Sequence, residues 1–237
     1  MNRKTAFLIC STVLLSTNIS ILTRIYADEK QTVNTNKIVD GKEESFTDET
    51  IESNTVGTSV ICNQNGGTVT INKNTLHKSG DTNNEGGKNA VVFTTGSSFT
   101  KIDQSDLQST SKGSSGIVAN EKAMVYANDS SIMTSNDSAN GLEAVSSGQI
   151  IANQMDITTQ GNQSAAVYAK QNDGSISLTN STLSTDGNNA PLLYANGTIE
   201  VDNVSGTASH SKIAEVEGGQ HLSIYNSQFS STNNSLL

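Results

Sequence analysis

Apolar residues recur in one fixed order from Gly66 to the end of the chain. Each copy begins at a small-residue turn, continues with apolar residues at alternate positions, and ends with one more apolar residue and a corner rich in Ser, Thr, Asn, Gly and Asp. The last apolar residues of successive copies are Leu76, Leu107, Ile132, Ile157, Leu183, Val204 and Phe229. Their separations are 31, 25, 25, 26, 21 and 25 residues, and a period of about 25 residues made of short strands and polar turns is typical of a solenoid.

The alternation within a copy predicts three short strands. The first strand presents an inward pair two residues apart, in the order Val69 and Ile71, Thr100 and Ile102, Val125 and Ala127, Ile150 and Ala152, Ile176 and Leu178, Ile199 and Val201, Leu222 and Ile224. The aligned last apolar residue points inward on the second strand. A third apolar stretch follows roughly ten residues later, at 90–93, 116–119, 141–145, 165–169, 191–195 and 212–216. We therefore expect an all-β fold, a right-handed parallel β-helix of about seven three-strand coils over residues 58–237.

Two other architectures fit the repeat less well. A helical repeat needs apolar spacings of three and four with Ala, Leu, Glu and Lys on its faces, whereas these segments are rich in Gly, Ser, Thr, Asn and Val. An antiparallel sandwich does not explain why the whole three-strand unit recurs with matching corners.

Asparagine recurs after the inward pair of most copies, at Asn128, Asn153, Asn180, Asn203 and Asn226. Stacked amides can hydrogen-bond their counterparts in adjacent coils. Asparagine also tolerates the left-handed turn conformation. We expect both effects to act at this corner.

The N-terminal region divides into two parts. Residues 1–27 carry Arg3 and Lys4 before an apolar run and end at Ala27, which indicates an export signal cleaved after Ala27; a membrane anchor is the alternative. Residues 28–57 are acidic and polar without sustained periodicity, so they form either a polar N-terminal cap on the solenoid or a disordered extension.

Charge and cysteine content narrow the classes of partner. The predicted signal contains three of the 14 basic residues, which leaves 11 against 23 acidic residues, a net charge of about −12, and no arginine. Nucleic acids and anionic membranes both need a basic face, so we expect neither nucleic-acid binding nor membrane insertion of the mature chain. Cys62 is the one cysteine outside the signal, which rules out an internal disulfide there. We expect it to be a small buried residue beside the first coil.

Three segments carry a resemblance to a known group of proteins. GSISLTNSTLSTDGNNAPLLYA, AMVYANDSSIMTSNDSANGLEAV and GQIIANQMDITTQGNQSAAVYA each combine a glycine turn, an alternating strand and a Thr/Ser-Gly/Asp corner. Over residues 58–237 the chain thus resembles the parallel β-helix of bacterial surface proteins, especially autotransporter passenger domains and adhesin-like repeats. The resemblance implies a secreted or cell-surface protein that adheres to a host surface, matrix or glycan. The chain departs from this group because no membrane barrel follows the repeats, so we expect a stand-alone or truncated passenger, a secreted product, or a subunit completed by another chain.

Candidate chemistry is sparse. Some parallel β-helices are polysaccharide lyases or glycoside hydrolases, and the best available carboxylate pair is Glu200 and Asp202 on one strand face. We expect that pair to be a solvated strand face. Asp81, Asp137 and Asp186 lie in similar Gly/Asn-rich corners, where turn chemistry is favoured over calcium binding. We therefore expect no catalytic residues, no metal site and no cofactor.

Tyrosines are the candidate ligand contacts. Tyr126 and Tyr225 occupy outward strand positions, while Tyr168 and Tyr194 recur in the third strand. Exposed tyrosines on a long sheet can stack on sugars, and core or edge packing is the alternative. Together these features predict an exported, non-enzymatic β-helix with an extended surface for adhesion, the alternative being a polysaccharide-active enzyme. The last coil lacks a polar cap, so we also expect self-association through the C-terminal coil.

Overall fold

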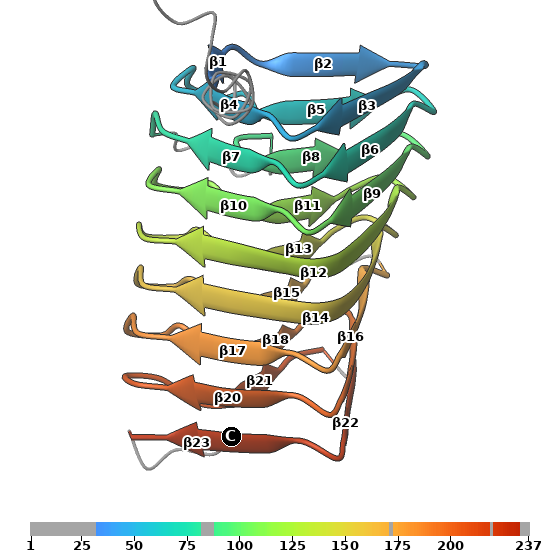
Figure 1. The fold of residues 1–237 in the computed structure, drawn as a ribbon. Coiled ribbons are helices and arrows are strands. Elements are labelled where there is room, and N and C mark those ends of the chain that lie inside the picture. Colours follow the sequence, from blue (N-terminus) through green and yellow to red (C-terminus); the bar gives the residue numbers. More distant parts are fainter. Residues whose placement is uncertain (1–31, 82–87, 171–172, 219, 233–237) are drawn as a thin grey trace, which may run out of the picture. The chain divides into compact units, whose positions relative to one another are not determined.

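The protein forms parallel strands stacked in three rows. The computed structural model describes residues 32–81, 88–170, 173–218 and 220–232, all within the compact unit Thr32–Leu237. No helix occurs among these residues, and hence none long and apolar enough to span a membrane. Successive coils place each strand beside its counterpart one coil earlier and one coil later (Figure 1).

The three rows are named here by their order within a coil. Row 1 contains β3 (Glu43–Thr47), β6 (Thr68–Asn72), β9 (Phe99–Asp103), the first halves of β12 (Met124–Thr134) and β14 (Gln149–Thr159), β16 (Ser175–Thr179), β19 (Thr198–Asp202) and β22 (His221–Tyr225). Row 2 contains β1 (Thr32–Asn34), β4 (Thr50–Ser53), β7 (Thr75–Lys78), β10 (Asp106–Ser109), the second halves of β12 and β14, β17 (Thr182–Thr185), β20 (Ser205–Ala208) and β23 (Gln228–Ser231). Row 3 contains β2 (Lys37–Asp40), β5 (Ile61–Gln64), β8 (Val92–Thr94), β11 (Ile117–Ala119), β13 (Leu142–Ala144), β15 (Val167–Ala169), β18 (Leu193–Ala195) and β21 (Ala214–Val216).

Every pairing between coils is parallel and in register. Rows 1 and 2 form one 15-stranded sheet that bends at a corner, and row 3 forms a separate 8-stranded sheet. The strands of row 3 span about seven turns from first to last. The predicted parallel β-solenoid with three strands per coil is thus confirmed, while its right-handed sense stays a prediction.

A narrow column of aliphatic side chains forms the core. On row 1 the inward positions predicted from the alternation stack in register, for example Val125, Ile150 and Ile176, and all three are buried. On row 2, Leu107, Ile132 and Ile157 stack in the same way. The core therefore follows the alternation that the sequence displays.

One predicted inward position was wrong. Val204 does not continue the row 2 column after Leu183, because Gly206 pairs with Leu183 and Phe229 pairs with Gly206. Val204 lies instead in the corner before β20, where it is buried at 1% exposure. Because the inward position of this coil is a glycine, the apolar pattern pointed to the corner residue Val204 in its place.

The corner between rows 1 and 2 contains a column of residues in the left-handed backbone conformation. Their φ values lie between 45° and 56°, and the column consists of Asp48, Lys73, Gln104, Asp129, Gln154, Asn180, Asn203 and Asn226. This conformation lets the chain turn sharply between two strands, and Asn and Asp adopt it at low cost. Three of the five recurring asparagines therefore have the predicted turn role.

The same corner also contains the predicted hydrogen bonds between stacked side chains. The Nδ2 atom of Asn153 donates to Oδ1 of Asn128 at 2.8 Å, and Nδ2 of Asn203 donates to Oδ1 of Asn180 at 2.8 Å. Asn128 and Asn153 lie one residue before the left-handed position, whereas Asn180 and Asn203 occupy it themselves. The corner combines amide stacking with turn chemistry.

Row 3 is unusual because much of it is buried on both faces. All three residues of β8, β11 and β13 are buried, and Phe93 and Val118 form a small outer cluster with Ala90, against which Cys62 packs. This explains why the third stretch at 90–93 and at 116–119 is a continuous apolar run instead of an alternation. The Cys62 thiol is half-buried, and its burial raises its pKa.

The N-terminal strands extend the rows into the segment 28–57. Strands β2, β3 and β4 pair in parallel with β5, β6 and β7, so the described rows begin at Thr32. Their inward residues Val39, Phe46 and Ile51 are at most 5% exposed. The predicted export signal, residues 1–27, lies outside the described residues.

The opposite end of the rows is more exposed. Inward-facing Ile224 on β22 is 43% exposed, and its neighbours Leu222 and Phe229 are only partly buried. Tyr225 and Val216 are 52% and 46% exposed. The last described coil therefore leaves apolar side chains in contact with solvent.

Candidate ligand-binding face

The outward face of row 3 combines aromatic and charged side chains. In register along this face lie Cys62, Phe93, Val118, Glu143, Tyr168, Tyr194 and Glu215. Parallel strands place these side chains about 4.8 Å apart from coil to coil. The face changes along its length from buried apolar residues to half-buried tyrosines and then to a partly exposed carboxylate.

Tyr168 and Tyr194 form a stacked pair on this face. Their ring centroids are 4.6 Å apart and their planes are inclined by 7°. The Nζ atom of Lys170 lies 5.4 Å from the centroid of the Tyr168 ring, a cation–π contact. Because Glu143 and Tyr194 flank Tyr168 in register, Lys170 lies on the Glu143 side of the ring and Tyr194 covers the other side.

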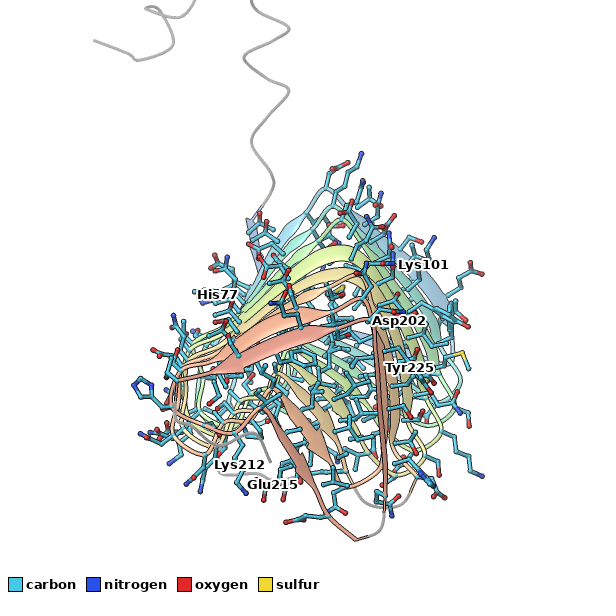
Figure 2. All side chains as sticks on the ribbon, turned by 90° about the horizontal axis from the view of Figure 1, so that it is seen from below. His77, Lys101, Asp202, Lys212, Glu215 and Tyr225 are labelled. Carbon is cyan, nitrogen blue, oxygen red and sulfur yellow. The ribbon has the colours of Figure 1, made fainter. Side chains whose placement is uncertain are left out.

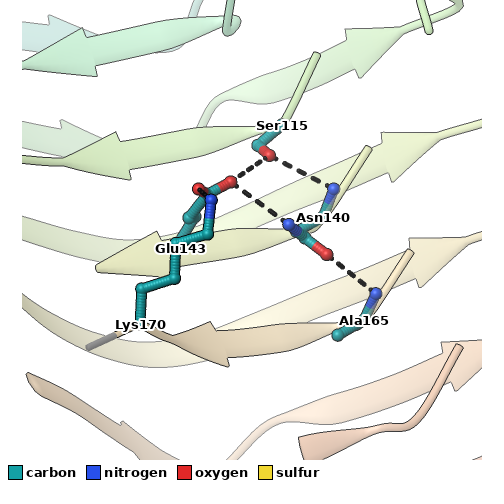
Figure 3. A network of polar contacts seen from close by, with 5 residues as sticks. All are labelled: Ser115, Asn140, Glu143, Ala165 and Lys170. Atoms are coloured by element: carbon teal, nitrogen blue, oxygen red, sulfur yellow. Dashed lines mark hydrogen bonds and ion pairs between the residues drawn. The ribbon is translucent and has the colours of Figure 1, made fainter. Parts of the chain in front are cut away.

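A buried carboxylate organises the start of this site (Figure 3). Glu143 is 5% exposed, and its Oε2 accepts hydrogen bonds from Ser115 Oγ at 2.7 Å and Asn140 Nδ2 at 3.1 Å. Its Oε1 lies 3.1 Å from Lys170 Nζ. Both oxygens of the Glu143 carboxylate are therefore engaged, which satisfies the requirement for partners of a buried charge.

The network continues into the backbone of the neighbouring coils. Ser115 Oγ accepts a hydrogen bond from the backbone N–H of Asn140 at 3.2 Å, and Asn140 Oδ1 accepts one from the N–H of Ala165 at 2.9 Å (Figure 3). Three consecutive coils are thus connected through side chains as well as through strand pairing. The network fixes the position of Glu143 and, through the ion pair, that of Lys170.

A second carboxylate lies beside Tyr194. Glu217 Oε2 accepts a hydrogen bond from Asn196 Nδ2 at 3.1 Å. Burial, and then hydrogen bonding to Glu217, hold the pKa of the Tyr194 hydroxyl well above its usual value. Burial also raises the pKa of Tyr168, against the opposing effect of Lys170. Both shifts favour the neutral phenol, which can donate a hydrogen bond.

The other two candidate tyrosines lie on a different face. Tyr126 and Tyr225 belong to row 1. Tyr126 is 40% exposed, and its ring meets the Phe99 ring edge to face, with the two ring centroids 5.5 Å apart. Figure 2 shows Tyr225 on the same side as Lys101 and Asp202, whereas Glu215 of row 3 projects from another side. The structure therefore brings Tyr168 and Tyr194 together and leaves Tyr126 and Tyr225 apart from them.

The candidate catalytic and calcium-binding carboxylates lie in ordinary strand and corner positions. Glu200 and Asp202 both face outward on β19, and Asp202 Oδ1 accepts a hydrogen bond from Asn226 Nδ2 at 2.8 Å. Asp81 and Asp137 accept backbone N–H groups of the next coil, from Lys112 at 2.8 Å and Asn162 at 2.9 Å. Asp186 Oδ1 lies 3.3 Å from His210 Nδ1. Among the described residues, no group of three or more His, Cys, Asp or Glu side chains could hold a metal ion.

Reasoning from the sequence missed four polar residues of the row 3 face. These are Glu143, Lys170, Asn196 and Glu217. The available signal was a glutamate inside the apolar run GLEAV and a lysine directly after the corresponding run AAVYA in the next coil. Since the two residues are 27 positions apart, only the coil register reveals that they are neighbours.

Comparisons with family models, with curated proteins and with solved structures find no match to this chain. The likeness to bacterial surface β-helices is therefore a likeness of sequence pattern. The structure itself establishes the parallel β-solenoid and the arrangement of its outward faces.

Proposed function

We propose that the protein is an exported, non-enzymatic β-solenoid that presents an extended surface for adhesion, and that the row 3 face around Tyr168 and Tyr194 contacts a glycan. In this proposal it acts at the cell surface or after secretion, in the manner of an autotransporter passenger or adhesin-like repeat. The stacked solenoid provides a stiff support on which the ligand contacts keep fixed spacings.

The tyrosine pair is the observation that carries this proposal. Sugar-binding sites combine aromatic surface with polar groups that are already oriented. Tyr168 and Tyr194 offer half-buried rings, and Asn196 and Glu217 provide oriented polar atoms next to them. Because these groups are held by contacts within the protein, a ligand would meet a preformed surface and little ordering cost would arise on binding.

The engaged state of Glu143 favours binding over hydrolysis. A general acid or base must reach the group whose proton it transfers. The two Glu143 oxygens contact Ser115, Asn140 and Lys170, so the carboxylate supports the face instead of projecting from it. The proposal accordingly assigns Glu143 a structural role.

A glycan panel tests the proposed function. We expect the mature protein to retain at least one glycan class without releasing shorter products. Replacing Tyr194 with alanine should weaken retention about tenfold, because the exposed part of the stacked pair is lost. Retention on a glycan array and chromatography of the supernatant measure the two properties.

Tyr126→Ala and Tyr225→Ala are the matched controls, since both remove an exposed tyrosine from row 1. We expect both variants to retain the glycan like the wild-type protein. Release of shorter products, abolished by Glu200→Gln or Asp202→Asn, would instead establish the polysaccharide-active enzyme. Equal losses for all three tyrosine variants would remove the special role of the row 3 face.

We further propose that the protein self-associates through its C-terminal coil, as a pair of identical chains. The exposed inward residue Ile224 and the outer edges of β21, β22 and β23, which pair with no further strand among the described residues, support this proposal. Sedimentation should show a concentration-dependent dimer, and Ile224→Lys should shift it to the monomer. Ile151→Lys is the control because Ile151 is similarly exposed, at 39%, in the middle of row 1. A strict monomer at high concentration contradicts the proposal.

A further inference from the structure

The protein already contains one ammonium site on the row 3 face, occupied by its own Lys170. The Lys170 ammonium lies 3.1 Å from a Glu143 oxygen and 5.4 Å from the Tyr168 ring centroid. A carboxylate and an aromatic face on the same side are a standard way to bind a primary ammonium group. This internal contact shows what geometry the repeat provides for such a group.

The next two coils repeat the aromatic and acidic side chains of this site, but not the lysine. Tyr194 follows Tyr168 in register, and Glu215 follows Tyr194. Tyr168 covers one face of the Tyr194 ring, so the other face is directed toward the Glu215 coil. The residue that corresponds to Lys170 is Asn196 in one coil and Glu217 in the next, because both directly follow the paired ends of β18 and β21.

Glu215 and Glu217 form no ion pair among the described residues. Glu217 is exposed and Glu215 is partly exposed. Glu217 accepts a hydrogen bond from Asn196, which is a neutral group. Lys212 lies on the same side of the molecule as Glu215 (Figure 2), but among the described residues no lysine forms an ion pair with Glu215 or Glu217. An aromatic face and two carboxylates thus lie together here. The lysine that accompanies Tyr168 and Glu143 one coil earlier has no counterpart at this position.

We propose that Tyr194, Glu215 and Glu217 bind the primary ammonium group of an amino sugar in a glycan. This inference rests on the proposed glycan-binding function and names the class of glycan. The ammonium group would lie over the free face of Tyr194 and pair with the two carboxylates, as Lys170 does with Tyr168 and Glu143. The sugar hydroxyls would meet the Asn196 amide and the Tyr194 hydroxyl.

The overall charge of the protein favours the same ligand. A net charge of −9 for the full chain repels polyanionic glycans and attracts a polymer with free amino groups. A lysine side chain of a protein partner carries the same ammonium group. The amide and hydroxyl groups beside Tyr194 favour a sugar, whose hydroxyls can use them, over an aliphatic lysine stem.

A matched pair of ligands tests the inference. A β-1,4-linked glucosamine hexamer and its fully N-acetylated form share one backbone and differ in charge. We expect the mature protein to bind the glucosamine hexamer about tenfold more tightly by isothermal titration calorimetry, with the difference shrinking as salt is added. Glu215→Gln and Glu217→Gln should each reduce the preference, and the double variant should abolish it.

Glu200→Gln is the control, because it removes an exposed carboxylate from row 1 and makes the net charge less negative by the same amount. It should leave the preference unchanged. Equal affinity for the two hexamers, or a loss of preference in Glu200→Gln as well, overturns the ammonium site. In that case, retention of another glycan on the panel still upholds the proposed function. Retention of no glycan at all refutes the proposed function itself. Binding of an oligolysine peptide with affinity for neither hexamer overturns the choice of an amino sugar.

Discussion

Replacing Lys170 with methionine is expected to lower the free energy of unfolding by about 3–5 kcal/mol, because the change leaves the buried carboxylate of Glu143 without its countercharge. The Glu143 side chain is only 6% exposed, whereas the Lys170 side chain is 33% exposed, so water can replace the ammonium group only in part. Ser115 and Asn140 would still donate hydrogen bonds to Oε2. Denaturant titration followed by circular dichroism measures the change.

Lys101→Met controls for the loss of one lysine and should change the free energy of unfolding by no more than about 0.5 kcal/mol, because Lys101 is exposed on row 1. The double variant Glu143→Leu with Lys170→Met should recover most of the lost stability, since no unpaired charge remains. If Lys170→Met is as stable as the wild-type protein, the Glu143–Lys170 pair does not stabilise the row 3 face.

Replacing Ile157 with alanine is expected to lower the free energy of unfolding by about 2–5 kcal/mol. Ile157 is 0% exposed and stacks between Ile132 and Leu183 in the row 2 core column. Its neighbours above and below are held in place by strand pairing, so they cannot collapse freely into the cavity. The unfolding midpoint in urea should fall while the slope stays unchanged.

Thr158→Ala is the matched control, since Thr158 is the next residue on β14 and points outward. Its effect should stay within about 0.5 kcal/mol. A similar loss of stability for both variants would mean that strand propensity, and not burial in the core column, determines the effect.

The sequence predicted the core well because the side-chain period of a strand is two. Val125 and Ala127, or Ile150 and Ala152, are assigned to the interior by alternation alone, and all four are buried. The prediction failed at Val204 because that coil has Gly206 at the inward position. A glycine carries no apolar signal, so the alignment moved to the nearest aliphatic residue.

The candidate site could be predicted only in part. Tyr168 and Tyr194 recur at the same place in consecutive copies, so their repetition was visible. The sequence also placed them in the third strand of their copies, apart from Tyr126 and Tyr225 at outward positions of the first strand. The register between coils was needed to show that the rings of Tyr168 and Tyr194 stack on each other.

The sequence by itself determined the repeat, the strand periodicity and the inward column, because these depend on the spacing of residues along the chain. Only the tertiary structure decided which polar residues meet. Glu143 and Lys170 pair across coils, and Glu217 joins Asn196 and Tyr194 in the same way. Coil length varies at the corners, so residues more than twenty positions apart become neighbours only when the strands pair and fix the register.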